Sequence, residues 1–228
     1  AWGLGVGVGM ALLGAVALLG YGQAVVAENK EDLAHELQVD TQRLSAQLGH
    51  LQLATSQMAM LVKAYGGEPR QAGEVLAQVR SQFPEITTLQ LAPQGIISLS
   101  EPAAGNEVVQ GWNLLEGAYM LEGAVQARNT GQPVLQGPFK TAQGQQALVL
   151  RAPVALAADA GTPQFWGLVT AMTDMDALQR TSGLHALKAK GIDFQIWRQN
   201  PDGAGGVEGV PEVLFSTESK VPGISARW

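Results

Sequence analysis

The sequence predicts an α+β fold: a transmembrane helix and a long stalk helix, followed by two α/β subdomains with antiparallel sheets. Three observations predict it. Residues 1–27 carry no charged side chain, and residues 28–65 contain no proline and repeat leucine at helical spacing. Beyond them, short apolar stretches alternate with turns that contain glycine or proline. The predicted domains are residues 1–27, 28–66, 67–156 and 157–228.

The apolar segment at residues 2–27 is predicted to span a membrane. About 20 apolar residues in a helix cross the hydrocarbon core and satisfy their own backbone hydrogen bonds. A signal peptide is the alternative, but its short apolar core follows a basic start, and no basic residue precedes Trp2. Residues 28–32 hold three acids and one base, so this flank lacks the excess of basic residues that marks the cytoplasmic side of a membrane helix. We therefore expect an anchor in the inner or plasma membrane and a periplasmic or extracellular soluble part.

Two glycine pairs in the apolar segment have the spacing that lets membrane helices approach each other closely. They are Gly3 with Gly7 and Gly5 with Gly9. Glycine is also simply frequent in membrane helices, so helix dimerisation and a plain span both remain open.

The long helix carries a heptad seam that is apolar at both ends and interrupted by Asp40 and Gln47. The seam fits either of two arrangements: pairing of two stalks in a homodimer, or packing of the helix on its own domain. The leucines expected at the dimer contact are Leu33, Leu37, Leu44 and Leu51.

Turn residues divide the rest of the chain. Residues 66–69 (GGEP) end the long helix, and Pro84 ends a short helix over residues 75–83. Residues 86–92 and 96–99 predict a hairpin around Pro93-Gln94-Gly95. The remaining expected elements are a helix at 113–129, strands at 134–135, 147–154 and 165–173, a helix at 175–187, and strands at 192–198 and 213–216.

Composition argues against several function classes. The net charge is −6 with scattered bases, which does not fit a nucleic-acid partner. His35, His50 and His185 have no partner at metal-ligand spacing and are interpreted as surface positions. No nucleophile elbow, P-loop or dinucleotide fingerprint occurs, so we expect no enzyme activity and no cofactor in this segment.

Several short motifs follow one another in a specific order. They are FPEI at 83–86, LQLAPQGII at 89–97, EP at 101–102, GWNL at 111–114, ARNTGQ at 127–132, GPF at 137–139 and LVLRAPV at 148–154. In this order and spacing the chain resembles a CHASE domain from about Phe83 to Arg198. CHASE domains are extracytoplasmic sensor modules of membrane-bound histidine kinases and nucleotide cyclases.

The resemblance implies a stalk helix and two PAS-like subdomains, of which the membrane-distal one (67–156) holds the ligand and the membrane-proximal one is 157–228. In the cytokinin-receptor branch, an acidic residue in the segment that matches residues 111–114 holds the ligand. Here Asn113 stands there, so a charge-assisted hydrogen bond of about 1.5–3 kcal/mol is lost and cytokinin is not the expected ligand. Leu135 matches that branch's apolar pocket position, and Gln143 lies near a third contact.

Independently of the resemblance, this region offers an apolar wall with a few polar groups, as a small-ligand site requires. The apolar residues are Trp112, Leu115, Leu135 and Phe139, and the polar ones are Asn113 and Arg151. The alternative for the apolar four is ordinary core. The alternative for Arg151 is an ion pair with Glu101 or Glu116.

The function expected from these patterns is that of a receptor module: a small molecule, as yet unidentified, binds outside the cytoplasm and the stalk passes its occupancy to a cytoplasmic kinase or cyclase. Membrane lipid and a second copy of the chain are the other expected partners. A docking subunit of a membrane complex is the alternative. A membrane-tethered hydrolase would need a catalytic pair that the sequence does not offer.

Overall fold

The computed structural model of the protein describes residues 30–117, 121–141, 144–157, 162–189, 195–198 and 212–216. The predicted membrane helix, with Gly3, Gly5, Gly7 and Gly9, lies outside these ranges. Among the described helices, none combines the length and apolar character that a bilayer crossing requires. The chain divides into two compact units, and residues 42–183 form the one that holds the main sheet.

The predicted long helix is confirmed as α1, Lys30–Ala64. From residue 42 onward, α1 presents a stripe at three- and four-residue spacing to an apolar core that it shares with the sheet. The stripe consists of Leu51, Ala54, Met58 and Val62, all with no exposed surface. This stretch therefore packs on its own domain. The side chains of Leu33 and Leu37 lie outside the described part, and pairing of two stalks stays a prediction.

Two glycines with left-handed backbone end α1, since the amide of Gly67 (φ 85°) donates to the carbonyl of Val62 at 2.8 Å. The short helix expected at residues 75–83 is confirmed as α3, Leu76–Ser81. An additional short helix, α2, Pro69–Gly73, precedes it.

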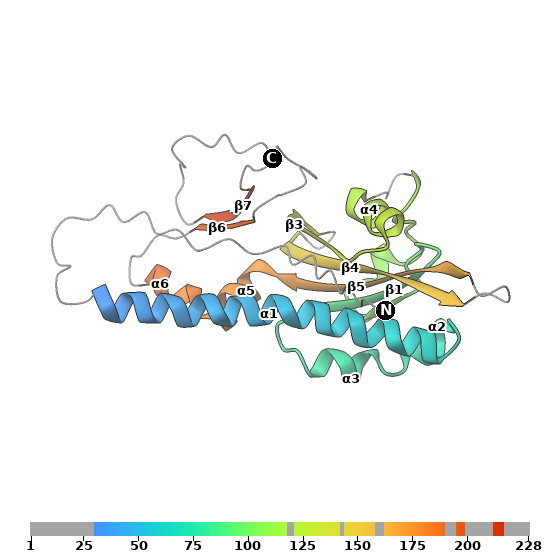
Figure 1. Ribbon diagram of the computed structural model, residues 1–228, viewed down its shortest axis with the longest axis horizontal. Helices are drawn as coiled ribbons and strands as arrows, with labels where there is room; N and C mark the ends of the chain where they lie inside the picture. The colour runs from blue at the N-terminus through green and yellow to red at the C-terminus, as the bar shows by residue number, and fades with distance from the viewer. Residues whose placement is uncertain are drawn as a thin grey trace, which may run out of the picture. The chain divides into compact units, whose positions relative to one another are not determined.

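Five antiparallel strands form the main sheet in the order β2-β1-β5-β4-β3. Figure 1 shows β1, β5, β4 and β3 of this sheet. The predicted hairpin is confirmed, because Leu91 of β1 lies opposite Leu99 of β2. The strands are β1, Thr88–Pro93; β2, Leu99–Glu101; β3, Val134–Lys140; β4, Gln146–Ala157; and β5, Pro163–Asp174.

The position of β5 corrects the predicted subdomain boundary at residues 156 and 157. This strand was expected to begin the second subdomain, but it pairs with β4 on one side and β1 on the other. Leu168 and Val169 are both fully buried although they face opposite sides of the sheet, as is typical of a central strand. The compact unit that holds the main sheet therefore includes β5 and continues to Gly183.

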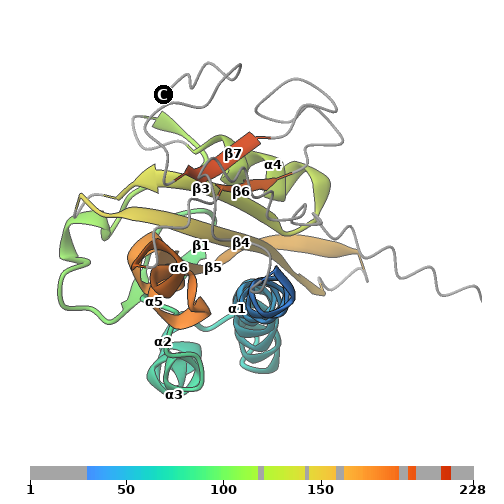
Figure 2. The ribbon, with the colours of Figure 1, turned by 90° about the vertical axis from the view of Figure 1, so that its left-hand side faces the viewer.

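Different helices cover the two faces of this sheet (Figure 2). Residues 42–64 of α1 pack on one face together with α2 and α3. The other face carries α4, Glu122–Thr130, and the short 3-10 helix η1, Glu107–Val109. The predicted helix over 113–129 is thus confirmed only in its second half.

Glycine also divides the helix expected at residues 175–187. Asp174 caps the N-terminus of α5, Met175–Ser182, by accepting a 2.5 Å hydrogen bond from the amide of Ala177. Gly183 (φ 92°) ends it, and α6, Leu184–Ala189, follows. The last two predicted strands correspond to β6, Gln195–Arg198, and β7, Glu212–Ser216, which pair with each other in a separate two-stranded sheet.

Candidate functional site

A row of polar side chains crosses the α4 face of the main sheet. Gln90 of β1 lies opposite Thr170 of β5, and Thr170 lies opposite Arg151 of β4. Their neighbours Leu91, Val169 and Ala152 belong to the core under α1, so the alternation of a strand turns the polar three toward α4. All three are buried, with Arg151 only 3% exposed.

Arg151 is held in place by two neighbours on β3. Its Nη1 donates a 2.7 Å hydrogen bond to Oε1 of Gln136, and its guanidinium carbon lies 5.8 Å from the centre of the Phe139 ring. Burial lowers the pKa of Arg151 to about 10, well below the usual value of a guanidinium, because the charged form loses its hydration. The Nε of Arg151 and the Oγ1 of Thr170 are both buried without a hydrogen-bond partner.

The expected ion pair between Arg151 and Glu101 or Glu116 is not formed. Glu101 accepts instead from Nε of Arg80 at 3.2 Å, and Glu116 is exposed. Within the described ranges no carboxylate forms an ion pair with Arg151. Glu101 lies on β2, which β1 and β5 separate from β4, so the sheet order rules this pairing out. Among the described residues, the partners of the buried Arg151 cation are therefore the amide of Gln136 and the ring of Phe139.

A glycine in α4 makes room for the amide that holds Arg151. Gly123 is buried, and a Cβ atom at this position would collide with the side chain of Gln136. Ala124 and Ala127 are also fully buried, so α4 approaches the sheet through small residues. This close approach covers Gln136 and keeps solvent away from the guanidinium.

A cavity of about 310 Å³ opens on the same face of the sheet. Met172 lines it, and Thr170 is the next residue of β5 on that face. Ala147 also lines it and lies opposite Phe139, the ring against which the guanidinium packs. The cavity is lined by Thr87, Thr88, Ala104, Gly105, Asn106, Thr141, Gln145, Ala147, Met172 and Asp174.

Comparison with known families connects this architecture to a class of proteins. The sequence profile of the CHASE domain matches residues 20–207. The chain belongs to the CHASE domain family. CHASE domains are sensor domains rather than enzymes, which agrees with the expected lack of catalysis in this segment.

Solved structures share the fold of this CHASE domain. One is an extracellular ligand binding receptor from Desulfohalobium retbaense DSM5692, with a TM-score of 0.59 and 17% identity. That similarity covers 83% of this chain and 32% of the receptor, so the chain spans about a third of its length. Another is the ligand-binding domain of the Pseudomonas aeruginosa PAO1 amino acid chemoreceptor PctC in complex with GABA, with a TM-score of 0.50 and 16% identity over 80% of this chain and 81% of that one. A search of curated proteins found no match.

The CHASE domain brings only some of the predicted ligand residues together. Phe139 and Arg151 are neighbours, since the guanidinium lies over the ring. Leu115 is buried in the core on the α4 face of the sheet, and Trp112 packs against the same cluster. Gln143 lies outside the described residues.

Leu135 and Asn113 are placed differently from the expectation. Leu135 lies opposite Leu150 and packs against the α1-side core, on the other face of the sheet from Arg151. Asn113 uses its Oδ1 to accept a 3.0 Å hydrogen bond from the amide of Leu115, which stabilises its own turn.

Sequence reasoning missed Thr170, Gln136 and the cavity residues Thr88 and Asp174. The one available signal was a threonine inside the apolar stretch of β5. The alternation of the strand places this threonine on the same face of the sheet as Arg151. The cavity residues lie on strands and loops far apart in the sequence, so no local pattern links them. Within the described part of the chain, no cluster of three or more metal-ligating side chains forms.

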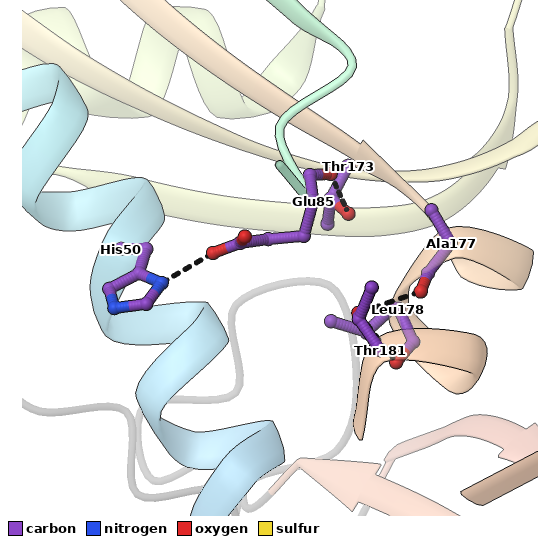
Figure 3. A network of polar contacts seen from close by, with 6 residues as sticks. All are labelled: His50, Glu85, Thr173, Ala177, Leu178 and Thr181. Atoms are coloured by element: carbon purple, nitrogen blue, oxygen red, sulfur yellow. Dashed lines mark hydrogen bonds and ion pairs between the residues drawn. The ribbon is translucent and has the colours of Figure 1, made fainter. Parts of the chain in front are cut away.

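A polar network joins α1 to the strand ends beside the cavity (Figure 3). His50 was expected to be a surface residue. It is half-buried, and its Nδ1 contacts Oε1 of the buried Glu85 at 2.5 Å. The hydroxyl of Thr173 donates to the backbone carbonyl of Glu85 at 2.7 Å. The next residue after Thr173 is Asp174, which lines the cavity. The network therefore connects the cavity wall with the long helix.

Proposed function

We propose that this CHASE domain is the extracytoplasmic small-molecule sensor of a membrane-anchored receptor. The observation that carries the proposal is the cavity of about 310 Å³ beside a buried polar row, on the sheet face opposite α1. Its volume falls in the range of small-ligand pockets, and its wall offers hydroxyl, amide and carboxylate groups that can orient a ligand. The names of the two similar structures, an extracellular ligand binding receptor and the ligand-binding domain of a chemoreceptor, support the same function.

The proposed mechanism begins with a ligand that binds one arrangement of the cavity wall better than another. The wall includes Thr87, two residues after Glu85, and Asp174, which directly follows Thr173. A shift of these strand ends reaches α1 through the pair of Glu85 and His50. In the proposed receptor, α1 continues as a stalk into a transmembrane helix in contact with lipid, and a homodimer passes the signal to a cytoplasmic kinase or cyclase.

The domain division belongs to the same proposal, with one change. The ligand-binding PAS-like subdomain runs to Gly183, the end of the compact unit. A smaller membrane-proximal subdomain, which contains the pair of β6 and β7, follows it. A docking subunit with a pocket filled by its own side chains was the alternative, and the open cavity favours the sensor.

The test is thermal unfolding of the protein with a library of purines, amino acids, organic acids and sugars. A ligand that binds only the native state raises the melting temperature. Ala104 lies on an exposed loop at the cavity, so Ala104→Phe should block entry and abolish the shift. Ala103→Phe is the matched control, because Ala103 is also exposed but does not line the cavity.

A shift that Ala104→Phe removes and Ala103→Phe preserves would support a sensor that uses this cavity. A folded protein that no member of the library stabilises, or a shift that Ala104→Phe leaves intact, would contradict the proposed site.

A further inference from the structure

Two neighbouring buried donors on the sheet lack hydrogen-bond partners. The Nε of Arg151 and the Oγ1 of Thr170 are both without a partner, and these residues lie directly opposite each other on β4 and β5. Thr170 is 1% exposed and Arg151 3%, so bulk water does not reach either group. Leaving a buried polar group unpaired costs about 1–3 kcal/mol and more for a charged one, so such pairs call for an explanation.

The chemistry of the two groups defines the partner that fits them. A guanidinium has only donors, and Nη1 of Arg151 already donates to Gln136, so the free Nε requires an acceptor. A threonine hydroxyl next to it donates to that same acceptor. No carboxylate of the described residues balances the charge of Arg151, so an acceptor with negative charge gains most.

The cavity leads toward these donors. Met172 separates the cavity from Thr170, and an unbranched thioether side chain can change rotamer to open the way. Among the described residues that line the cavity there is no basic side chain, and the carboxylate is that of Asp174, which already accepts from the amide of Ala177. Arg151 would therefore supply the positive charge that the described cavity wall does not provide.

From these observations we infer that the sensor recognises a small oxyanion, a carboxylate or a phosphate, whose oxygens accept hydrogen bonds from Nε of Arg151 and Oγ1 of Thr170 while the rest of the molecule occupies the cavity. The inference rests on the proposed sensor function and adds the chemical class of its ligand. The aromatic ring of Phe139 and the amide of Gln136 keep the guanidinium in position before the ligand arrives.

The experiment titrates the protein with acetate, succinate and inorganic phosphate, and with acetamide and succinamide as uncharged counterparts. Calorimetry and melting temperature report binding. Spectra of protein with ¹⁵N-labelled arginine report the Nε–Hε group of Arg151 directly. The variants are Thr170→Val, which removes only the hydroxyl, and Arg151→Lys, which keeps the charge but loses Nε. Arg80→Lys is the control, since Arg80 pairs with Glu101 away from the cavity.

We expect at least one acid to bind and to move the Arg151 Nε–Hε signal, while the amides do neither. Thr170→Val should weaken that acid about tenfold and Arg151→Lys more than tenfold, with Arg80→Lys unchanged. If succinate binds and phosphate does not, the ligand is a carboxylate; if phosphate binds and succinate does not, the ligand is a phosphate. If a variant does not fold, the signal in the unaltered protein decides the outcome.

Equal binding of acids and amides, or acid binding with an unmoved Nε–Hε signal, would overturn the inference. The failure of the inference and that of the proposed function are distinguishable. If a neutral ligand binds and Ala104→Phe blocks it, the proposed sensor function is supported and only the inference that the ligand is an oxyanion fails.

Discussion

The imidazole of His50 contacts the carboxylate of Glu85 at 2.5 Å, although the two residues lie 35 positions apart in the sequence. Glu85 is 4% exposed and precedes β1, while His50 lies on the rim of the otherwise apolar α1 stripe and its ring is 5.2 Å from that of Phe83. A buried carboxylate is costly unless paired, so this contact selects one position of α1 along the sheet.

Removal of the imidazole should destabilise the protein. His50→Ala leaves the carboxylate of Glu85 buried without this partner, and we expect a loss of about 1–3 kcal/mol in the free energy of unfolding. Urea unfolding of His50→Ala, Glu85→Gln and the double variant measures the coupling between them. Strictly additive single effects would show that the contact contributes nothing.

The same pair should transmit ligand binding to α1. Saturation with a ligand should slow amide hydrogen exchange in residues 47–55 of the unaltered protein, because the strand end that holds Glu85 becomes more rigid. In His50→Ala the ligand should still bind but no longer protect these amides. Equal protection in both proteins would exclude this route.

Replacement of the buried cation should stabilise the unliganded protein. Because the pKa of Arg151 is lowered to about 10, the folded state disfavours its charged form by about 3 kcal/mol below that pH. Arg151→Met also loses the bond to Gln136, so we expect a net gain of about 1–2 kcal/mol at pH 7. Chemical unfolding of both proteins gives the difference.

The advantage of Arg151→Met should depend on pH in a defined direction. Above about pH 10 the unfolded chain binds more protons at Arg151 than the folded one, so the stability of the unaltered protein rises relative to the variant. The difference should therefore be constant from pH 6 to 9 and shrink above pH 10. A variant less stable than the unaltered protein at pH 7 would contradict an uncompensated charge.

A single methyl group in α4 should disturb the site without touching Arg151. Gly123→Ala forces the side chain of Gln136 away from its present position, which breaks its bond to Nη1. We expect a loss of about 1–2 kcal/mol in stability, although alanine is the better helix former. The Arg151 Nη signals in arginine-labelled spectra should shift. Unchanged signals would show that Gln136 does not hold the guanidinium.

Gly49 provides the matched substitution outside the site. It lies in the interior of α1, is exposed, and a Cβ there would meet nothing within 4 Å. Gly49→Ala should therefore stabilise the protein by about 0.5–1 kcal/mol through helix propensity alone. Thermal unfolding measures it, and ligand binding should not change. A loss of stability would indicate a contact of this helix face with another chain.

Local pattern was sufficient for α1, for the hairpin of β1 and β2, and for the apolar strands β4 and β5, because periodicity and turn residues are properties of contiguous sequence. The ends of the helices were harder to predict from the sequence. The helix expected at residues 113–129 begins only at Glu122, since residues 113–117 form a turn stabilised by Asn113. The helix expected at 175–187 is divided by the left-handed backbone of Gly183.

The sequence by itself determined the α+β class, the long helix and the family, since each rests on residues that are neighbours in the chain or on motifs in fixed order. Only the tertiary structure decided that β5 inserts between β1 and β4 and that the compact unit around this sheet continues to Gly183. That insertion is also what places Thr170 opposite Arg151, and the sheet order keeps Glu101 away from it. Strand order and facing are set by long-range burial, and no short window of sequence contains that information.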